Sequence, residues 1–141
     1  MKVSVIYAST TGNTEAMANA INEAVTSAGA ETIFGTADSA DAGSVAASDV
    51  ILLGSPAMGD EILEDTMEEF YTGLEGSLSG KKVGLFGSYD WGDGQWLRDW
   101  ENRARNAGAD VSESLMVHLT PEADDIAKCQ DWAKTALKQA Q

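Results

Sequence analysis

The stretch Val3-Ser4-Val5-Ile6-Tyr7-Ala8-Ser9-Thr10-Thr11-Gly12-Asn13-Thr14 decides the fold. Residues 3–7 are apolar enough for a buried β-strand, and residues 9–14 consist almost wholly of hydrogen-bonding groups. A helical pattern follows directly, so several backbone N–H groups and the positive end of a helix dipole converge on the turn. This arrangement predicts an anion site, and phosphate is the anion that suits it best.

Two interpretations of residues 9–14 stay open when the turn is read alone. Neither G-x-x-x-x-G-K-[ST] nor G-x-G-x-x-G can be read there, and no Lys or Arg lies nearby in the sequence. The turn could bind phosphate through amide and hydroxyl donors alone. It could also be an ordinary strand-to-helix turn in which Thr or Asn caps the helix.

The length of 141 residues suits a single domain over residues 1–141. Cys129 is the sole cysteine and His118 the sole histidine, so we expect neither an internal disulfide nor a metal site. The sequence shows no signal-peptide pattern and no apolar run that approaches a membrane span. We therefore expect a soluble, cytoplasmic protein that has no contact with a membrane.

The charge is strongly negative and unevenly distributed. The net charge is −14: residues 1–80 hold 13 acidic side chains against Lys2 alone, and residues 81–141 hold 10 against 8 basic ones. This acidity argues against nucleic acid as a partner. An acidic chain would be attracted to basic protein faces, although the charge could also serve solubility alone.

The remaining chain alternates between strand and helix patterns. The continuous apolar run at 50–53 is typical of a strand buried on both faces of a parallel sheet. Expected strands cover 3–7, 31–36, 49–54, 81–88 and 111–119; expected helices cover 13–28, 62–74, 95–107 and a last one capped by Thr120-Pro121, with one weak helical turn within 36–48. This alternation predicts an α/β fold with a doubly wound parallel sheet.

Three elaborate loops, at 9–14, 55–61 and 88–94, follow the first, third and fourth expected strands. The carboxyl ends of parallel strands meet at one edge of a sheet, where ligands bind at the topological switch point. The three loops should therefore converge, which favours the phosphate interpretation of the first.

With these loops together, the chain resembles the flavodoxins, specifically the short-chain type of anaerobic bacteria. The matching strings are Ser9-Thr10-Thr11-Gly12-Asn13-Thr14, Ala57-Met58-Gly59-Asp60-Glu61, Leu85-Phe86-Gly87-Ser88-Tyr89 and Trp91-Gly92-Asp93-Gly94. The similarity covers essentially the whole chain, and the fifth strand lacks the long insertion of long-chain relatives. The resemblance implies a flavodoxin-like five-stranded sheet of order 2-1-3-4-5, helices on both faces and noncovalently bound FMN.

The resemblance also assigns residues to the cofactor. The first loop would hold the FMN phosphate, Met58 and Trp91 would cover the two ring faces, and Glu61 would accept from flavin N3–H. Ser55, Pro56 and Ala57 would line the ribityl or ring region, and amides around residues 89–92 would face the O2 side. The full expected set is Ser9, Thr10, Thr11, Gly12, Asn13, Thr14, Ser55, Pro56, Ala57, Met58, Gly59, Asp60, Glu61, Ser88, Tyr89, Asp90, Trp91 and Gly92.

The implied function is that of a low-potential one-electron carrier, a semiquinone/hydroquinone shuttle between redox enzymes and not an enzyme itself. We expect a monomer whose partners present basic faces, such as ferredoxin-type reductases or oxidoreductases. The alternative is an FMN-dependent NAD(P)H or quinone reductase on the same fold. That activity would need a second pocket over the flavin, whereas Met58 and Trp91 would close both faces. A receiver domain fits poorly, because acidic residues do not follow the first and third strands.

Individual residues raise further expectations. Gly59 could act as a redox-linked hinge, because its peptide can flip at little cost in φ. A carboxylate about 10 Å from the ring would shift the second reduction potential by roughly 20–70 mV, so the acidic residues near the flavin would lower it. Asp90 replaces the Gly that is common in the family, and its carboxylate could lie near the ring or in solvent. Ala8 stands where close relatives have a large aromatic.

The structural residues are expected to pack in the core. They are Met17, Met67, Met116 and Cys129, and also Trp96, Trp100 and Trp132, which are expected to be core or half-buried packing residues rather than flavin contacts. His118 is expected on a strand, with no chemical role.

Overall fold

The computed structural model describes residues 1–59 and 61–140 and has the α/β fold that the sequence predicts. Its strands are β1 Lys2–Tyr7, β2 Glu31–Thr36, β3 Val50–Gly54, β4 Lys82–Tyr89, β5 Asp110–Val111 and β6 Leu115–His118. Its helices are α1 Asn13–Ser27, α2 Ala42–Ala46, α3 Asp65–Glu75, α4 Gln95–Asn106 and α5 Ala123–Gln139. The strands form one parallel sheet of order β2-β1-β3-β4-β5, in which β6 also pairs with β4, so the predicted order is confirmed.

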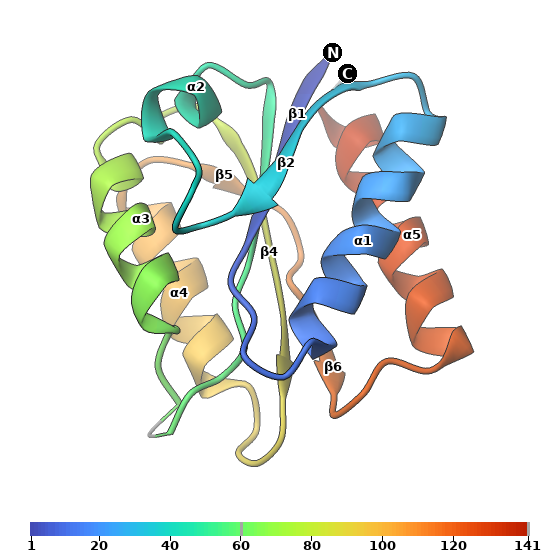
Figure 1. The fold of residues 1–141 in the computed structure, drawn as a ribbon. Helices are drawn as coiled ribbons and strands as arrows, with labels where there is room; N and C mark the ends of the chain where they lie inside the picture. Colours follow the sequence, from blue (N-terminus) through green and yellow to red (C-terminus); the bar gives the residue numbers. More distant parts are fainter. Residues whose placement is uncertain (60, 141) are drawn as a thin grey trace.

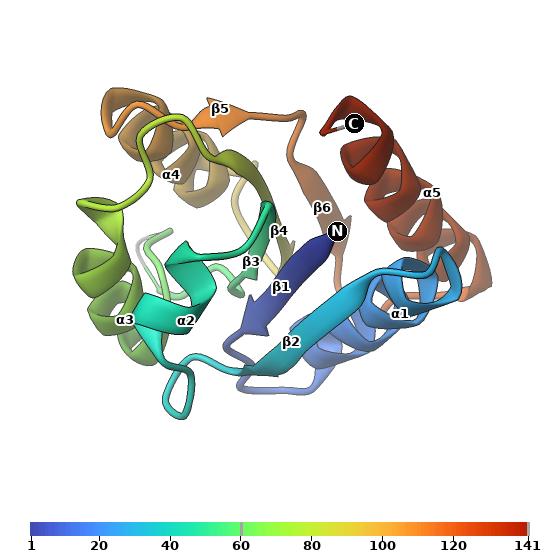
Figure 2. The ribbon, with the colours of Figure 1, turned by 90° about the horizontal axis from the view of Figure 1, so that it is seen from above.

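Helices cover both faces of the sheet. Helices α1 and α5 lie on one face, and α3 and α4, with the short α2, lie on the other (Figures 1 and 2). The third strand shows why its sequence is continuously apolar: Val50 and Leu52 join the core under α1 and α5, whereas Ile51 and Leu53 join the core under α3 and α4. Each of its side chains is therefore buried on one face or the other.

The core contains most of the residues that the sequence places there. Met17, Met67 and Cys129 are fully buried, and Trp96 and Trp100 are each 1% exposed. Burying one such large side chain contributes roughly 1.5–3 kcal/mol. The placement of Met116 was wrong, because its side chain is 45% exposed while the neighbouring Val117 points inward. The alternation of side chains along β6 puts only one of these two residues in the core.

Two helices begin later than the sequence suggests. Helix α3 begins at Asp65 rather than Ile62, because the Glu64 carboxylate accepts hydrogen bonds from the amides of Thr66 and Met67 and so caps the helix there. Helix α5 is capped at Glu122 rather than at Thr120-Pro121, since the Asp125 carboxylate accepts from the Glu122 amide at 3.0 Å. Local capping by acidic side chains therefore sets both boundaries.

The sequence predicts one continuous last strand from Val111 to Leu119. In the structure this strand is split into β5 and β6. The Ser112 amide still donates to the Val83 carbonyl at 3.0 Å. The Glu113 carbonyl instead accepts from the indole N–H of Trp132 on α5, at 2.6 Å. A side chain of α5 thus binds the Glu113 carbonyl, which a continuous strand would have paired with β4. Residues 112–114 therefore lie outside the strands.

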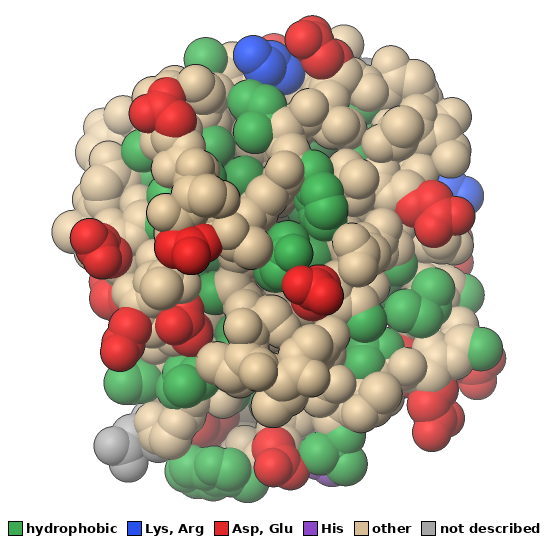
Figure 3. All heavy atoms as spheres, in the orientation of Figure 1, with side chains coloured by type: hydrophobic (Ala, Val, Ile, Leu, Met, Phe, Trp, Pro, Cys, Tyr) green, Lys and Arg blue, Asp and Glu red, His purple; other side chains and the backbone are tan. Residues whose placement is uncertain are grey.

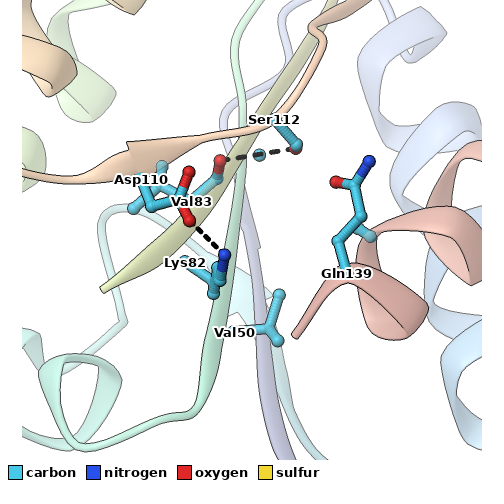
Figure 4. Close-up of a pocket in the computed structure, with 8 residues that line it drawn as sticks. Val50, Lys82, Val83, Asp110, Ser112 and Gln139 are labelled. Carbon is cyan, nitrogen blue, oxygen red and sulfur yellow. Dashed lines mark hydrogen bonds and ion pairs between the residues drawn. The ribbon is translucent and has the colours of Figure 1, made fainter. Parts of the chain in front are cut away.

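At the amino ends of β3 and β4 lies a cavity of about 20 Å³, with room for about one water molecule. Figure 4 shows its polar wall, where Lys82 pairs with Asp110 and the Ser112 hydroxyl donates to the Val83 carbonyl. This end of the sheet is opposite to the three long loops (Figure 1). In the described part of the chain, no helix is long and apolar enough to cross a membrane.

Cys129 should be unreactive in the folded protein. Its side chain is fully buried, and burial, with a smaller effect from Asp125, raises the pKa of the thiol to about 11. We expect no reaction with a chromogenic disulfide reagent at about pH 8 until the protein unfolds, when one thiol should react. Because the folded pKa exceeds that of a free thiol, the stability contributed by the neutral thiol should decline as the pH rises toward 11. Rapid reaction of the native protein would contradict this.

Candidate functional site

The three polar loops converge at the carboxyl edge of the sheet. They follow β1, β3 and β4, which are neighbours in the sheet order, and they lie together at the lower edge in Figure 1. The backbone ties them further: the Ala8 amide donates to the Gly54 carbonyl, and the Ala57 amide to the Ser88 carbonyl, each at 2.9 Å. The convergence expected from the sequence is therefore present.

The loop after β1 presents backbone donors at the start of α1. Gly12 is the N-cap and adopts φ 94°, a conformation that glycine reaches at little cost. The Ser9 hydroxyl accepts from the Gly12 amide at 3.1 Å and more weakly from the Glu15 amide at 3.4 Å. Within the described residues, the amides of Thr10, Thr11, Asn13 and Thr14 have no acceptor. These donors and the helix dipole can bind an anion.

Two side-chain contacts fix the surroundings of this loop. The Thr14 and Ser88 hydroxyls lie 2.7 Å apart and are buried. The Tyr7 hydroxyl donates to the Glu15 carboxylate at 3.1 Å, and burial, with Glu15 as a smaller cause, raises the pKa of Tyr7. Neither contact could be predicted from the sequence, because side-chain partners that only the fold brings together leave no local pattern.

The loop after β3 contains a tight turn. The Met58 amide donates to the Ile62 carbonyl, and the Glu61 amide donates back to the Met58 carbonyl, both at 2.9 Å. Glu61 has φ 51°, which is uncommon for a residue other than glycine. Met58 is partly buried and Gly59 is exposed, whereas Asp60 lies outside the described residues.

The Glu61 carboxylate connects this turn to the loop after β4. Its Oε1 accepts from the amides of Asp93, Gly94 and Gln95 at 3.3, 3.1 and 3.0 Å. Gly94 is the N-cap of α4 and makes no side-chain cap bond of its own. Glu61 therefore caps α4 from a different loop, a role that the sequence did not suggest.

The loop after β4 exposes an aromatic side chain. Trp91 is 60% exposed, and the Asp90 side chain is exposed as well. The Asp90 carbonyl accepts from Nε2 of His118 at 2.8 Å, and the His118 ring lies 4.8 Å from the ring of Tyr89. His118 thus supports the loop from β6.

The expected site residues divide by exposure. Buried are Thr14, Ser55, Pro56 and Ser88; partly buried are Ser9, Asn13, Ala57, Met58, Glu61 and Tyr89; exposed are Thr10, Thr11, Gly12, Gly59, Asp90, Trp91 and Gly92. The described members of the set all come from the three converging loops, the ends of their strands or the first turn of α1, which holds Asn13 and Thr14. Among the described residues, no group of three His, Cys, Asp or Glu side chains could hold a metal ion.

Acidic side chains dominate the surface near these loops. Asp and Glu are spread over the face shown in Figure 3, whereas Lys and Arg are few there. On α3, Glu68 is engaged by Arg103 of α4 at 2.7 and 2.9 Å, and this pairing lowers the pKa of the Glu68 carboxyl. Arg103 thus partly neutralises one acid of α3.

Comparison with known proteins decides the family. Residues 5–132 match the Flavodoxin family. The chain belongs to the flavodoxin family. Over 137 residues it is 47% identical to flavodoxin from Megasphaera elsdenii, covering 96% of this chain and 98% of that one, and it is 39% identical to flavodoxin from Clostridium beijerinckii over 92% and 95%. The solution structure of two-electron reduced M. elsdenii flavodoxin, also 47% identical, superposes with a TM-score of 0.88 over 96% of this chain and 98% of that one.

As a short-chain flavodoxin, the chain is an FMN-containing, low-potential electron carrier rather than an enzyme. It exchanges electrons with redox proteins. The reductase alternative is therefore set aside.

Proposed function

We propose that the three converging loops hold FMN in one domain over residues 1–141, with the phosphate at residues 9–14. The observation that supports this most is the set of amide donors at the start of α1, which have no acceptor among the described residues. An alkyl phosphate is a dianion with strong acceptor oxygens, and such donors at a helix N-terminus match it. The residues present therefore fit the group, although no basic side chain lies within the loop.

The ring would lie between the other two loops. Met58 offers a polarizable side chain on the turn after β3, and Trp91 offers a largely exposed indole on the loop after β4. On the side of the β3 loop, the ring or ribityl chain would be lined by Ser55, Pro56, Ala57 and Gly59. On the side of the β4 loop, it would be lined by Tyr89, Asp90 and Gly92. When bound, FMN supplies the one-electron chemistry, and the protein's role is to orient it and tune its potential.

Glu61 would serve the ring and the helix together. Its Oε1 accepts from the three amides of residues 93–95 at the start of α4, and its second oxygen has no hydrogen bond among the described residues. A carboxylate has about four lone-pair sites, so Oε2 can accept from the N3–H of the flavin while Oε1 stays on α4. The hydrogen bonds from the start of α4 would hold this carboxylate in place.

The partners that suit this surface carry basic faces. The chain bears a net charge of −14, and Asp65 and Glu69 on α3 and Asp90 and Asp93 beside Trp91 are exposed. Such a field attracts positively charged proteins and speeds encounter. We propose ferredoxin-type reductases or oxidoreductases as partners of a monomer, and exclude nucleic acid.

The visible spectrum during stepwise reduction tests this function directly. Purified flavin-loaded protein should pass from yellow through blue to colourless, with electrons taken up one at a time. It should not oxidise NADH or NADPH at a catalytic rate. Sustained NAD(P)H oxidation without an added partner would overturn the proposal.

Gly59 is proposed as the hinge that favours the half-reduced state. In the conformation described, a Cβ at position 59 would meet no atom within 4 Å, so alanine fits it. A flipped peptide that needs positive φ would cost alanine about 1–2 kcal/mol. Gly59→Ala should therefore bind FMN normally but yield at least about fivefold less of the blue form at equilibrium. Gly76→Ala, which also meets no atom within 4 Å, is the control, and equal yields in both variants would reject the hinge.

A further inference from the structure

We propose that Ser88 is a positioning residue for the phosphate end of FMN and acts through the hydroxyl of Thr14. This inference rests on the proposed function, in that the loop at residues 9–14 receives the phosphate. Ser88 itself would not contact the phosphate. Its task would be to orient the Thr14 hydroxyl and to leave that hydroxyl's proton available.

The geometry singles out this pair. Thr14 lies in the first turn of α1, and Ser88 lies near the carboxyl end of β4, 74 residues away in the sequence. Their hydroxyl oxygens are 2.7 Å apart, and the residues are only 1% and 4% exposed. The contact fastens the start of α1 to a central strand of the sheet.

Hydrogen-bond counting gives the contact a direction. Each hydroxyl has one proton to donate and can accept two hydrogen bonds. If Thr14 donates to Ser88, Thr14 has no proton left for an anion. If Ser88 donates to Thr14, Thr14 can donate outward. An anion at the loop selects the second arrangement, because a hydrogen bond to a charged oxygen is the stronger one.

Ser88 also links two of the three loops. Its side chain reaches the first loop through Thr14, and its carbonyl accepts from the Ala57 amide of the second at 2.9 Å. Substitution of the side chain leaves the carbonyl bond in place. Ser88→Ala therefore removes the support of Thr14 without removing the backbone link to residue 57.

A second hydroxyl pair provides a matched control. Ser4 on β1 and Ser48, just before β3, have hydroxyl oxygens 2.6 Å apart and are fully buried. This pair lies toward the amino ends of the strands, away from the three loops. Ser48→Ala and Ser88→Ala each leave one buried hydroxyl without its partner, so similar losses of stability are expected.

The experiment compares FMN with riboflavin, which lacks the phosphate. Wild type, Ser88→Ala, Ser88→Cys and Ser48→Ala are loaded with each flavin and diluted, and the return of free-flavin fluorescence gives the affinities. Ser88→Ala should weaken FMN binding about tenfold and leave riboflavin binding unchanged. Ser88→Cys keeps a weak donor of similar size and should fall between. Ser48→Ala should alter neither affinity.

The outcomes separate the inference from the proposed function. If wild type binds FMN no better than riboflavin, the proposed phosphate site at residues 9–14 is wrong. If wild type prefers FMN to riboflavin and Ser88→Ala keeps the full preference, the proposed phosphate site is supported and the role of Ser88 is rejected. An equal loss of both flavins in Ser88→Ala would also reject it, as would a loss in Ser48→Ala of the same size. Should Ser88→Ala not fold, Ser88→Cys decides by the same ratio.

Discussion

Replacement of Gly87 with alanine should destabilise the protein by more than about 3 kcal/mol and release FMN. A Cβ at this position would lie 2.1 Å from the Ser55 carbonyl oxygen and 2.9 Å from the Trp96 ring. The obstacle is the backbone at the end of β3, where the strand passes into the loop that follows it, and this backbone cannot move alone. The Ser55 amide donates to the Phe86 carbonyl, and the Ser55 carbonyl accepts from the Trp96 indole, so displacement would break both bonds.

Chemical denaturation and flavin content measure this effect. Gly84→Ala on the same strand is the closest comparison, because its Cβ would meet the ends of the Leu52 and Trp132 side chains at 2.8 and 3.0 Å. Those ends can shift, so a smaller loss is expected. Gly73→Ala, inside α3 with no atom within 4 Å, should be neutral or stabilising by up to about 1 kcal/mol. Wild-type stability in Gly87→Ala would contradict the close approach of the Ser55 carbonyl to position 87.

Glu61→Ala should cost about 1–2 kcal/mol of unfolding free energy even in the flavin-free protein. The reason is that the amides of residues 93–95 lose a shared acceptor and α4 loses its cap. In the flavin-loaded protein the loss should be larger, because the same carboxylate is proposed to bind the ring. Urea unfolding of both forms separates the two contributions.

Glu61→Gln is the matched variant. Its amide oxygen can still accept from α4, but the negative charge at the helix N-terminus is gone, so the flavin-free protein should lose less than in Glu61→Ala. A flavin-free Glu61→Ala protein as stable as wild type would mean that the capping bonds contribute nothing. A loss that appears only in the loaded protein would leave Glu61 with a role at the ring alone.

Local patterns predicted most of the fold. The run at 50–53 indicated a strand buried on both faces, and the stripe at Trp96 and Trp100 indicated the buried face of α4; both are confirmed. These signals depend only on the spacing of apolar residues. The order of the strands came from the resemblance, since spacing alone does not place β1 between β2 and β3.

What the sequence could not predict depends on partners distant along the chain. The split between β5 and β6 requires Trp132 to take the Glu113 carbonyl, and the capping of α4 requires Glu61 to reach another loop. The Thr14–Ser88 pair is of the same kind. Each contact joins segments that only the folded sheet brings together, so no motif marks it. The start of α3 was missed for a different reason: Glu64 is a local cap of a type less common than Ser, Thr, Asp or Asn.

Two long helices begin at the sheet edge where the three loops converge, and both have glycine N-caps of nearly the same conformation, Gly12 at φ 94° and Gly94 at φ 93°. As positively polarised helix ends the two would be equivalent, and an elongated ligand with one anionic end could bind in either of two orientations. At the start of α4, the Glu61 carboxylate already accepts from the free amides. At the start of α1, the amides of Thr10, Thr11, Asn13 and Thr14 have no acceptor among the described residues. In the proposed FMN site, the Glu61 cap would therefore set the direction of the ligand: the start of α1 would take the charged phosphate, and the start of α4 would be left to the neutral ring.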